Sequence, residues 1–210
     1  MRVLSSNLKD ICFLVNEKIR INEKINGNLI NTHNYISTEN MLPNRGGIVE
    51  AEKLPAVKSI NKFSENDILI SNIRPYFKKI WFANQEGACS NDILVLRSKN
   101  DINPLFLYYI LSSDEFFEYT TLTSKGTKMP RGDKSAIMNY EVPNISLEMQ
   151  KWIVGKLKNL DEKIFINQMI NKNLIYKKLK IFESDFLNFH IRNINLSRHE
   201  FWKETISHFN

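Results

Sequence analysis

Hydrophobic positions change their spacing along the first hundred residues. Residues 4–15 carry apolar side chains at helical spacing, which predicts a short amphipathic helix. These residues are Leu4, Leu8, Ile11, Cys12 and Val15. Residues 22–34 are polar and predict a loop. From Tyr35 to Leu96, short runs of Ile, Val and aromatic residues alternate with turn clusters, a pattern that indicates β-sheet.

The clearest predicted strands cover residues 68–73, 79–83 and 93–96, spaced so that consecutive strands could pair antiparallel. Asn103-Pro104 then supplies an N-cap and a first helical residue, which predicts a helix over 105–119 that packs on the sheet. Residues 120–134 predict a polar, glycine-containing loop. The pattern therefore predicts an α+β fold with a mixed or antiparallel sheet flanked by helices.

A long helix is predicted after this domain. Ser146 can cap a helix that runs to about Phe189 and is on the order of 60 Å long, which is excessive for a globular helix. Steps of four and three give a heptad seam: Ile153, Leu157, Leu160, Ile164, Asn167, Asn171, Leu174 and Lys178. A second seam begins one position later: Ile175, Leu179, Phe182, Phe186 and Phe189. Such a helix needs a partner helix and predicts a coiled coil.

The polar seam positions Asn167 and Asn171 leave two interpretations open. They fix the register and orientation of a helix pair, or they face solvent where the seam shifts. The helix also carries eight lysines between Lys151 and Lys180. Because an exposed lysine-rich face is usual for an amphipathic helix, we assign this helix to pairing rather than to nucleic acid.

Composition excludes several classes of protein. With 42% hydrophobic and 25% charged residues, the chain can fold as one sizeable domain or as a smaller domain with an appendage. It lacks the roughly 20 apolar residues of a membrane span, and Asp10 precedes any apolar region of a secretory signal. These features predict a cytoplasmic protein. The two cysteines, Cys12 and Cys89, fit reduced core thiols.

Catalytic and metal-binding motifs are missing from the sequence. The prolines include no Pro-Pro pair, so the Asn/Asp-Pro-Pro-aromatic motif of amino-methyltransferases is absent. The seven glycines form no phosphate-binding loop, and the four histidines show no metal-ligand spacing. Isolated carboxylates at Asp67, Asp92 and Asp133 fit surface or turn positions. We therefore expect neither a catalytic site nor a bound metal.

Charge points to a polyanionic partner. The net charge is +6 with a pI near 9.2, and two loops concentrate it. Loop 72–79 contributes Arg74, Lys78 and Lys79 as candidate DNA contacts, with Asn72 and Tyr76 as weaker ones. Loop 123–134 contributes Lys125, Lys128 and Arg131, with Thr127 as a weaker one. Such side chains grip phosphates and read base edges, whereas the alternative is two solvated turns.

Five segments in order resemble the specificity subunit of Type I restriction-modification enzymes. Residues 63–76 match a family segment F-x-x-G-D-I-L-x-x-x-x-R-P, with Asn66 in place of the usual Gly. The others are 89–97, Pro104 with 106–111, the segment Gly126-Thr127-Lys128-Met129-Pro130-Arg131, and Val142-Pro143 with Gln150, Ile153, Leu157 and 160–164. Together they extend over about residues 4–189. The departure at Asn66 affects the tightness of that turn.

The resemblance implies a target recognition domain that reads half of a split double-stranded DNA sequence, and a long spacer helix that docks methyltransferase subunits. Family members usually contain two such domains and two such helices, whereas this chain has one of each. A half subunit can therefore form a two-fold homodimer with antiparallel helices, which demands a palindromic split site. S-adenosylmethionine, ATP and Mg would belong to the methyltransferase and restriction subunits, so this chain would be non-catalytic.

These expectations divide the chain into three parts: a recognition domain over 1–144, a spacer and dimerisation helix over 145–190, and a tail over 191–210. Two alternatives stay open. One is a truncated or silent specificity cassette that forms no active enzyme. The other is a coiled-coil interaction protein that does not bind DNA. The recognised bases do not follow from the sequence.

Overall fold

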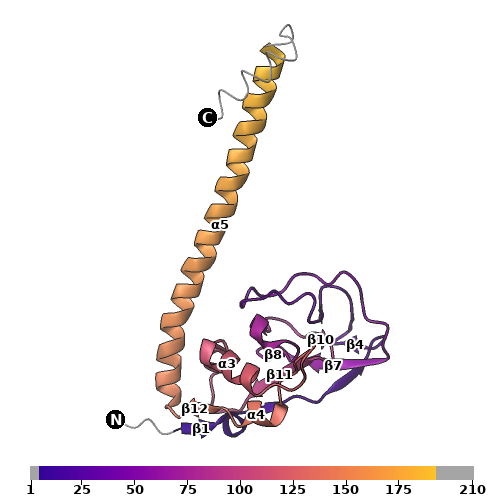
Figure 1. Cartoon of the computed structure of the whole chain (residues 1–210), viewed down its shortest axis with the longest axis vertical. Coiled ribbons are helices and arrows are strands. Elements are labelled where there is room, and N and C mark those ends of the chain that lie inside the picture. The colour runs from indigo at the N-terminus through magenta and orange to yellow at the C-terminus, as the bar shows by residue number, and fades with distance from the viewer. Residues whose placement is uncertain (1–4, 193–210) are drawn as a thin grey trace. The chain divides into compact units, whose positions relative to one another are not determined.

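The computed structural model describes residues 5–192 (Figure 1), with side chains to Phe186. Its strands are β1 (Ser5–Asn7), β2 (Cys12–Leu14), β3 (Lys18–Arg20), β4 (Lys24–Ile25), β5 (Asn28–Leu29), β6 (Tyr35–Ile36), β7 (Ser59–Phe63), β8 (Ile68–Ser71), β9 (Ile80–Phe82), β10 (Gly87–Cys89), β11 (Ile93–Ser98) and β12 (Glu141–Pro143). Its helices are α1 (Leu8–Ile11), the 3-10 helix η1 (Pro75–Phe77), α2 (Pro104–Leu111), α3 (Asp114–Leu122), α4 (Lys134–Met138) and α5 (Leu147–Arg192). The chain divides into two compact units between Gly155 and Lys156.

The described strands of the first unit form two four-stranded sheets and two two-stranded ribbons. One sheet has the order β2-β11-β8-β9 and is antiparallel throughout. The other has the order β3-β7-β10-β6, in which β10 and β6 run parallel. The ribbons are β1-β12 and β4-β5. These sheets, with helices beside them and a long C-terminal helix, confirm the predicted α+β class.

Alternation along β8 explains how the core is layered. All four residues of this strand are buried. Ile68 and Ile70 belong to a cluster with residues of α2 and α3, including Phe116. Leu69 belongs to another cluster with Phe63 of β7. Because successive strand residues point to opposite faces, one face of the β8 sheet packs on helices and the other packs toward the second sheet.

Two predicted helices and one strand pairing need correction. The predicted helix over 4–15 is helical only at Leu8–Ile11, because β2 instead pairs with β11 through Leu14 and Leu96. The helix expected over 105–119 is two helices, because the Ser113 side chain accepts a hydrogen bond from the Phe116 N–H and starts α3 anew. β11 pairs with β8 rather than with its expected neighbour β9.

The segment expected to be a loop over 22–34 contains the β4-β5 hairpin. Asn26 and Gly27 join the two strands with φ values of 45° and 89°. Positive φ at both central residues is what a type I′ hairpin turn requires, and Asn-Gly is the preferred pair there. The sequence therefore contains the signal for this hairpin.

Side-chain hydrogen bonds fix the starts of α2 and α5. As predicted, Asn103 caps α2 by accepting from the N–H groups of Leu105 and Phe106. Ser146 Oγ likewise accepts from the Met149 N–H at 3.3 Å. Gln150 of α5 is 2% exposed, and its Oε1 accepts from the Asn103 N–H at 2.9 Å. The first turn of α5 is thus tied to the cap of α2.

The second unit contains the rest of α5. At 1.5 Å per residue, the whole 46-residue helix is about 69 Å long. Every side chain from Lys158 to Phe186 is exposed. Among residues 5–192, no helix combines the length and apolar character that a bilayer crossing requires. The predicted tail over 191–210 lies outside the residues whose side chains are described.

Candidate nucleic-acid interface

The two basic loops identified in the sequence lie side by side. The Arg74 N–H donates to the Pro130 carbonyl at 2.8 Å, and the Gly132 N–H donates to the Asn72 carbonyl at 3.0 Å. Lys125 and Arg131 exchange backbone hydrogen bonds of 2.9 Å in both directions, which closes the second loop on itself. Segments nearly sixty positions apart in the chain are therefore joined by backbone hydrogen bonds.

A third loop joins them. In the turn 43–47, the Asn44 N–H donates to the Phe77 carbonyl at 2.8 Å and the Arg45 N–H donates to the Lys78 carbonyl at 2.9 Å. We call the combination of residues 43–47, 72–79 and 125–132 the loop surface. Its backbone is bonded from loop to loop, so the loops hold one another in place.

Four residues of the loop surface that are not glycine have left-handed backbone conformations. Their φ values are 53° at Asn44, 60° at Arg45, 50° at Arg74 and 52° at Lys78. Arg and Lys rarely adopt this region, and each such residue persists only where its surroundings fix it. The inter-loop hydrogen bonds of Asn44, Arg45 and Arg74 supply that constraint. Concentrated backbone strain of this kind is typical of functional surfaces.

Asp114 at the start of α3 organises one edge of the loop surface. Its Oδ1 lies 2.5 Å from Arg45 Nη2 and 2.6 Å from Lys78 Nζ. Arg45 also donates to the Ser112 carbonyl and lies over the Phe117 ring at 5.6 Å. The hydrogen bond from Lys78, followed by that from Arg45, lowers the pKa of Asp114 to about 2. Asp114 therefore stays ionised and holds both cations near neutral pH.

The other paired cations of the loop surface have separate acceptors. Lys125 Nζ lies 2.5 Å from Asp133 Oδ2, and this hydrogen bond lowers the pKa of Asp133. Arg131 Nη2 lies 3.0 Å from Asp92 Oδ1. Lys79 Nζ donates to the Thr38 carbonyl at 2.6 Å, and burial lowers the pKa of Lys79. These contacts orient the side chains in the free chain.

Two of the predicted contacts, Arg74 and Lys128, are exposed and form no ion pair within the part of the chain that the structure describes. Thr127 is exposed beside Lys128. Tyr76 is 46% exposed, and its ring centroid lies 4.7 Å from that of Phe77. Exposed cations beside aromatic rings can contact phosphates and base edges.

Asn72 lies beneath the loops rather than at their tip. Its Oδ1 is buried without a hydrogen-bond partner in the described structure. A Cβ atom on Gly132 would lie 2.8 Å from this oxygen, so glycine permits the two loops to approach each other. Of the predicted DNA contacts, Asn72 thus has the clearest role in the packing of the loops.

Sequence reasoning missed Arg45, Phe77 and Asp114. The turn Pro43-Asn44-Arg45-Gly46-Gly47 is visible in the sequence, but nothing local indicates that it joins loop 72–79. Asp114 is 36 positions from Lys78, so their contact depends on the tertiary fold. Three or more His, Cys, Asp or Glu side chains do not cluster as a metal site anywhere in the described residues.

The predicted helix seam lies on α5. Ile153 and Leu157 are half-buried, and Asn167 and Asn171 are exposed. The apolar members further along are 40–56% exposed: Leu160, Ile164, Leu174, Leu179, Phe182 and Phe186. The rings of Phe182 and Phe186 stack with centroids 6.1 Å apart. The seam is therefore a partly exposed apolar face of the described chain.

Comparison with known proteins agrees with the fold and with the resemblance found in the sequence. Residues 3–176 match the family model described as the Type I restriction modification DNA specificity domain. The Type I restriction enzyme EcoDI specificity subunit of Escherichia coli is 28% identical over 100 residues, which are 48% of this chain and 22% of that protein.

Two solved structures share the fold. The HsdS subunit from Thermoanaerobacter tengcongensis aligns with a TM-score of 0.57 and 21% identity, covering 77% of this chain and 42% of that one. A chain from a structure on complex assembly and conformational transition of the type I R-M system aligns with a TM-score of 0.58 and 18% identity. That alignment covers 81% of this chain and 46% of the other. This chain thus spans less than half the length of these relatives.

The family match covers most of the chain, and it includes the loop surface and α5 as far as residue 176. The chain belongs to the family of Type I restriction-modification DNA specificity domains.

Proposed function

We propose that this chain reads one half of a bipartite DNA target through the loop surface. The observation that carries the proposal is the backbone-bonded meeting of the two basic loops, with Arg74 and Lys128 left exposed and without ion pairs among the described residues. Rigid loops fix the position of a side chain relative to base edges, which sequence reading requires.

The predicted contacts divide by chemistry. Arg74 can make bidentate hydrogen bonds to a guanine edge, whereas Lys128 suits a phosphate. Lys78, Lys125 and Arg131 are held by carboxylates in the free chain, and DNA phosphates can replace those carboxylates. Tyr76 and Thr127 are exposed beside them. Lys79 and Asn72 are engaged within the loops and serve mainly to position the others.

We also propose that α5 forms an antiparallel pair with the same helix of a second copy. Its apolar seam is partly exposed over more than twenty residues, and burying the exposed part of each such side chain against a partner stabilises the pair by about 1 kcal/mol. Asn167 and Asn171 would set the register of that pair. A two-fold dimer presents two loop surfaces and reads a palindromic split site.

A second apolar set on α5 supports methyltransferase docking. At 3.6 residues per turn, four exposed residues fall outside the seam. These are Phe165, Ile166, Met169 and Tyr176, which are 46–63% exposed. One helix can therefore pair with its copy on one face and bind a methyltransferase subunit on the other. Restriction subunits would join through that assembly.

On this proposal residues 1–144 recognise DNA, residues 145–190 pair and dock, and residues 191–210 form a tail. Methyl transfer and cleavage belong to the partner subunits, which would hold S-adenosylmethionine, ATP and Mg. The chain itself positions them on DNA.

The experiment is to co-express the chain with its cognate methyltransferase subunit in a host without adenine methylation, and to map modified adenines across the genome. A palindromic split motif is expected. A split motif that is not palindromic would contradict the homodimer, because a different recognition half must then complete the reader. Absence of methylation would contradict the proposed function and favour a silent cassette or a coiled-coil interaction protein.

A further inference from the structure

A second basic surface lies at the edge strand β3 of the mixed sheet. In β3, Ile19 is buried and pairs with Ile60, so Lys18 and Arg20 both project from the opposite face, where they are exposed. The free edge of β3 is not covered by another strand of that sheet in the described structure. These two cations therefore lie at the outer border of the sheet.

The turn 90–92 connects this border to the loop surface. Lys18 Nζ donates to Asn61 Oδ1 at 2.6 Å and to Asn91 Oδ1 at 2.5 Å. The next residue, Asp92, binds Arg131 through its carboxylate at 3.0 Å, and its carbonyl accepts from the Asn72 N–H at 2.8 Å. Lys18 therefore contacts Asn91, and Arg131 contacts the next residue, Asp92.

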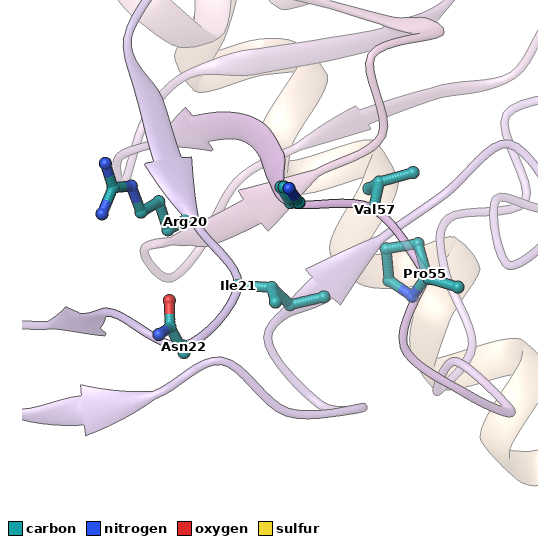
Figure 2. Close-up of a pocket in the computed structure, with 7 residues that line it drawn as sticks. Arg20, Ile21, Asn22, Pro55 and Val57 are labelled. Atoms are coloured by element: carbon teal, nitrogen blue, oxygen red, sulfur yellow. The ribbon is translucent and has the colours of Figure 1, made fainter.

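A groove extends the border beyond Arg20 (Figure 2). It has a volume of about 740 Å³ and is lined by Arg20, Ile21, Asn22, Pro55, Ala56, Val57 and Lys58. The Ile21 N–H donates to the Lys58 carbonyl at 3.4 Å, which links its two sides. Ile21 points toward Pro55 and Val57, whereas the Arg20 guanidinium points away from them.

Both cations of the groove are free to meet an anion. Arg20 and Lys58 are exposed, and neither forms a side-chain ion pair within residues 5–186. The nearby Glu23 carboxylate accepts from the backbone N–H of Arg20 at 3.1 Å rather than from its guanidinium. None of the seven lining residues is acidic. The groove is thus an open, positively charged surface with apolar side chains between its cations.

We propose that this edge surface, made of Lys18, Arg20, Asn22 and Lys58, binds the sugar-phosphate backbone of the same duplex outside the bases that the loop surface reads. The inference rests on the proposed DNA-reading function. Charge complementarity and continuity through Asn91 and Asp92 favour duplex DNA as the occupant. Contacts of this kind strengthen binding and set orientation without adding sequence preference.

The test uses the full chain with its methyltransferase subunit and two duplexes that carry the mapped target. One duplex ends at the target, and the other extends by about one helical turn at each end. The wild-type complex is expected to bind the extended duplex more tightly. R20Q/K58Q is expected to lose that gain and to keep the methylation motif unchanged. The salt slope, which is the dependence of the logarithm of affinity on the logarithm of salt concentration, should fall in magnitude by about 1.8 per subunit on the extended duplex.

The control K9Q/K53Q removes the same charge from exposed lysines elsewhere on the unit and is expected to keep the gain. Retention of the full gain by R20Q/K58Q, or no gain from extension in the wild type, overturns the inference while leaving target binding intact. Failure of the wild type to bind either duplex would overturn the proposed function itself, so the two failures are distinguishable.

Discussion

The two units of this chain use the same apolar residue types in opposite ways. In the first unit, Leu69 and Phe63 are fully buried between sheets, and Phe116 is fully buried among α2, α3 and the sheet beside them. In the second, Ile164 and Leu174 are more than half exposed along a single helix. The first unit therefore buries most of its large hydrophobic residues within itself, whereas the helix leaves those of its seam largely exposed.

Their ion pairs differ in the same way. Asp67 is completely buried and binds Arg97 through two hydrogen bonds of 2.7 and 2.8 Å. On the helix, Lys158 and Glu162 are both exposed and 4.0 Å apart. A charge that is buried in the fold depends on its partner, while an exposed pair is solvated in either state. The first unit thus depends on a buried ion pair for its stability, whereas this pair of the helix is exposed to solvent.

The largest expected effect is on pairing of the helix. I164D/L174D places carboxylates in the seam, and it should weaken self-association by about 1,000-fold or more, because four buried apolar side chains are lost per dimer. Sedimentation should then give the 24.7 kDa mass of the single chain. The free energy of unfolding of the first unit should not change.

The second apolar set on α5 offers the matched control. F165D/Y176D carries the same two charges at exposed positions outside the seam. It should leave the dimer intact and abolish co-purification with the methyltransferase subunit. If both variants lost the dimer equally, the assignment of separate faces would be wrong.

Loss of the buried pair should be the next largest effect. D67A leaves the Arg97 guanidinium with the Glu17 carboxylate at 3.4 Å and the Ser64 hydroxyl at 3.0 Å. It also removes the acceptor of the Ser64 N–H. The free energy of unfolding of the first unit should fall by about 3 kcal/mol. Urea denaturation followed by near-ultraviolet circular dichroism measures this.

The double variant D67L/R97M should lose less than D67A, because neither charge is then left without its partner. An equal loss in both variants would show that packing at position 67, rather than charge, stabilises the turn 64–67.

Substitutions in the loop surface should change DNA binding by an intermediate amount, whereas a substitution on the helix should not change it. R74Q should weaken binding by about 1–3 kcal/mol at one base position and relax the motif there. K128Q should lower the salt slope by about 0.9 for every target sequence. K172Q removes another exposed lysine, on α5, and should change neither property. Unaltered binding by R74Q and K128Q would place the DNA elsewhere.

Sequence patterns correctly predicted the strands and helix starts that are determined by neighbouring residues. The strands near Ile68 and Ile93, the Asn103 cap and the Ser146 start of α5 all follow from residues within a few positions of one another. The hairpin at Asn26-Gly27 had the same kind of signal and could have been predicted.

The features that the sequence did not predict depend on contacts between distant parts of the chain. Cys12 to Leu14 fit a helix locally, but pairing with β11 made them a strand. The sequence named both basic loops, but only the fold brings Arg74 to Pro130 and Lys78 to Asp114. Which cations stay exposed depends on such contacts, so the candidate site could be predicted as two loops and not as one surface.

The smallest expected effect concerns the exposed ion pair of the helix. E162Q removes the exposed partner of Lys158 and should change the free energy of unfolding by less than about 0.5 kcal/mol. Thermal unfolding of the dimer, followed by far-ultraviolet circular dichroism, measures this. A loss as large as that of D67A would mean that Glu162 is covered in the assembly. The helix pair or a docked subunit would then bury this position, because solvent would otherwise screen the charge.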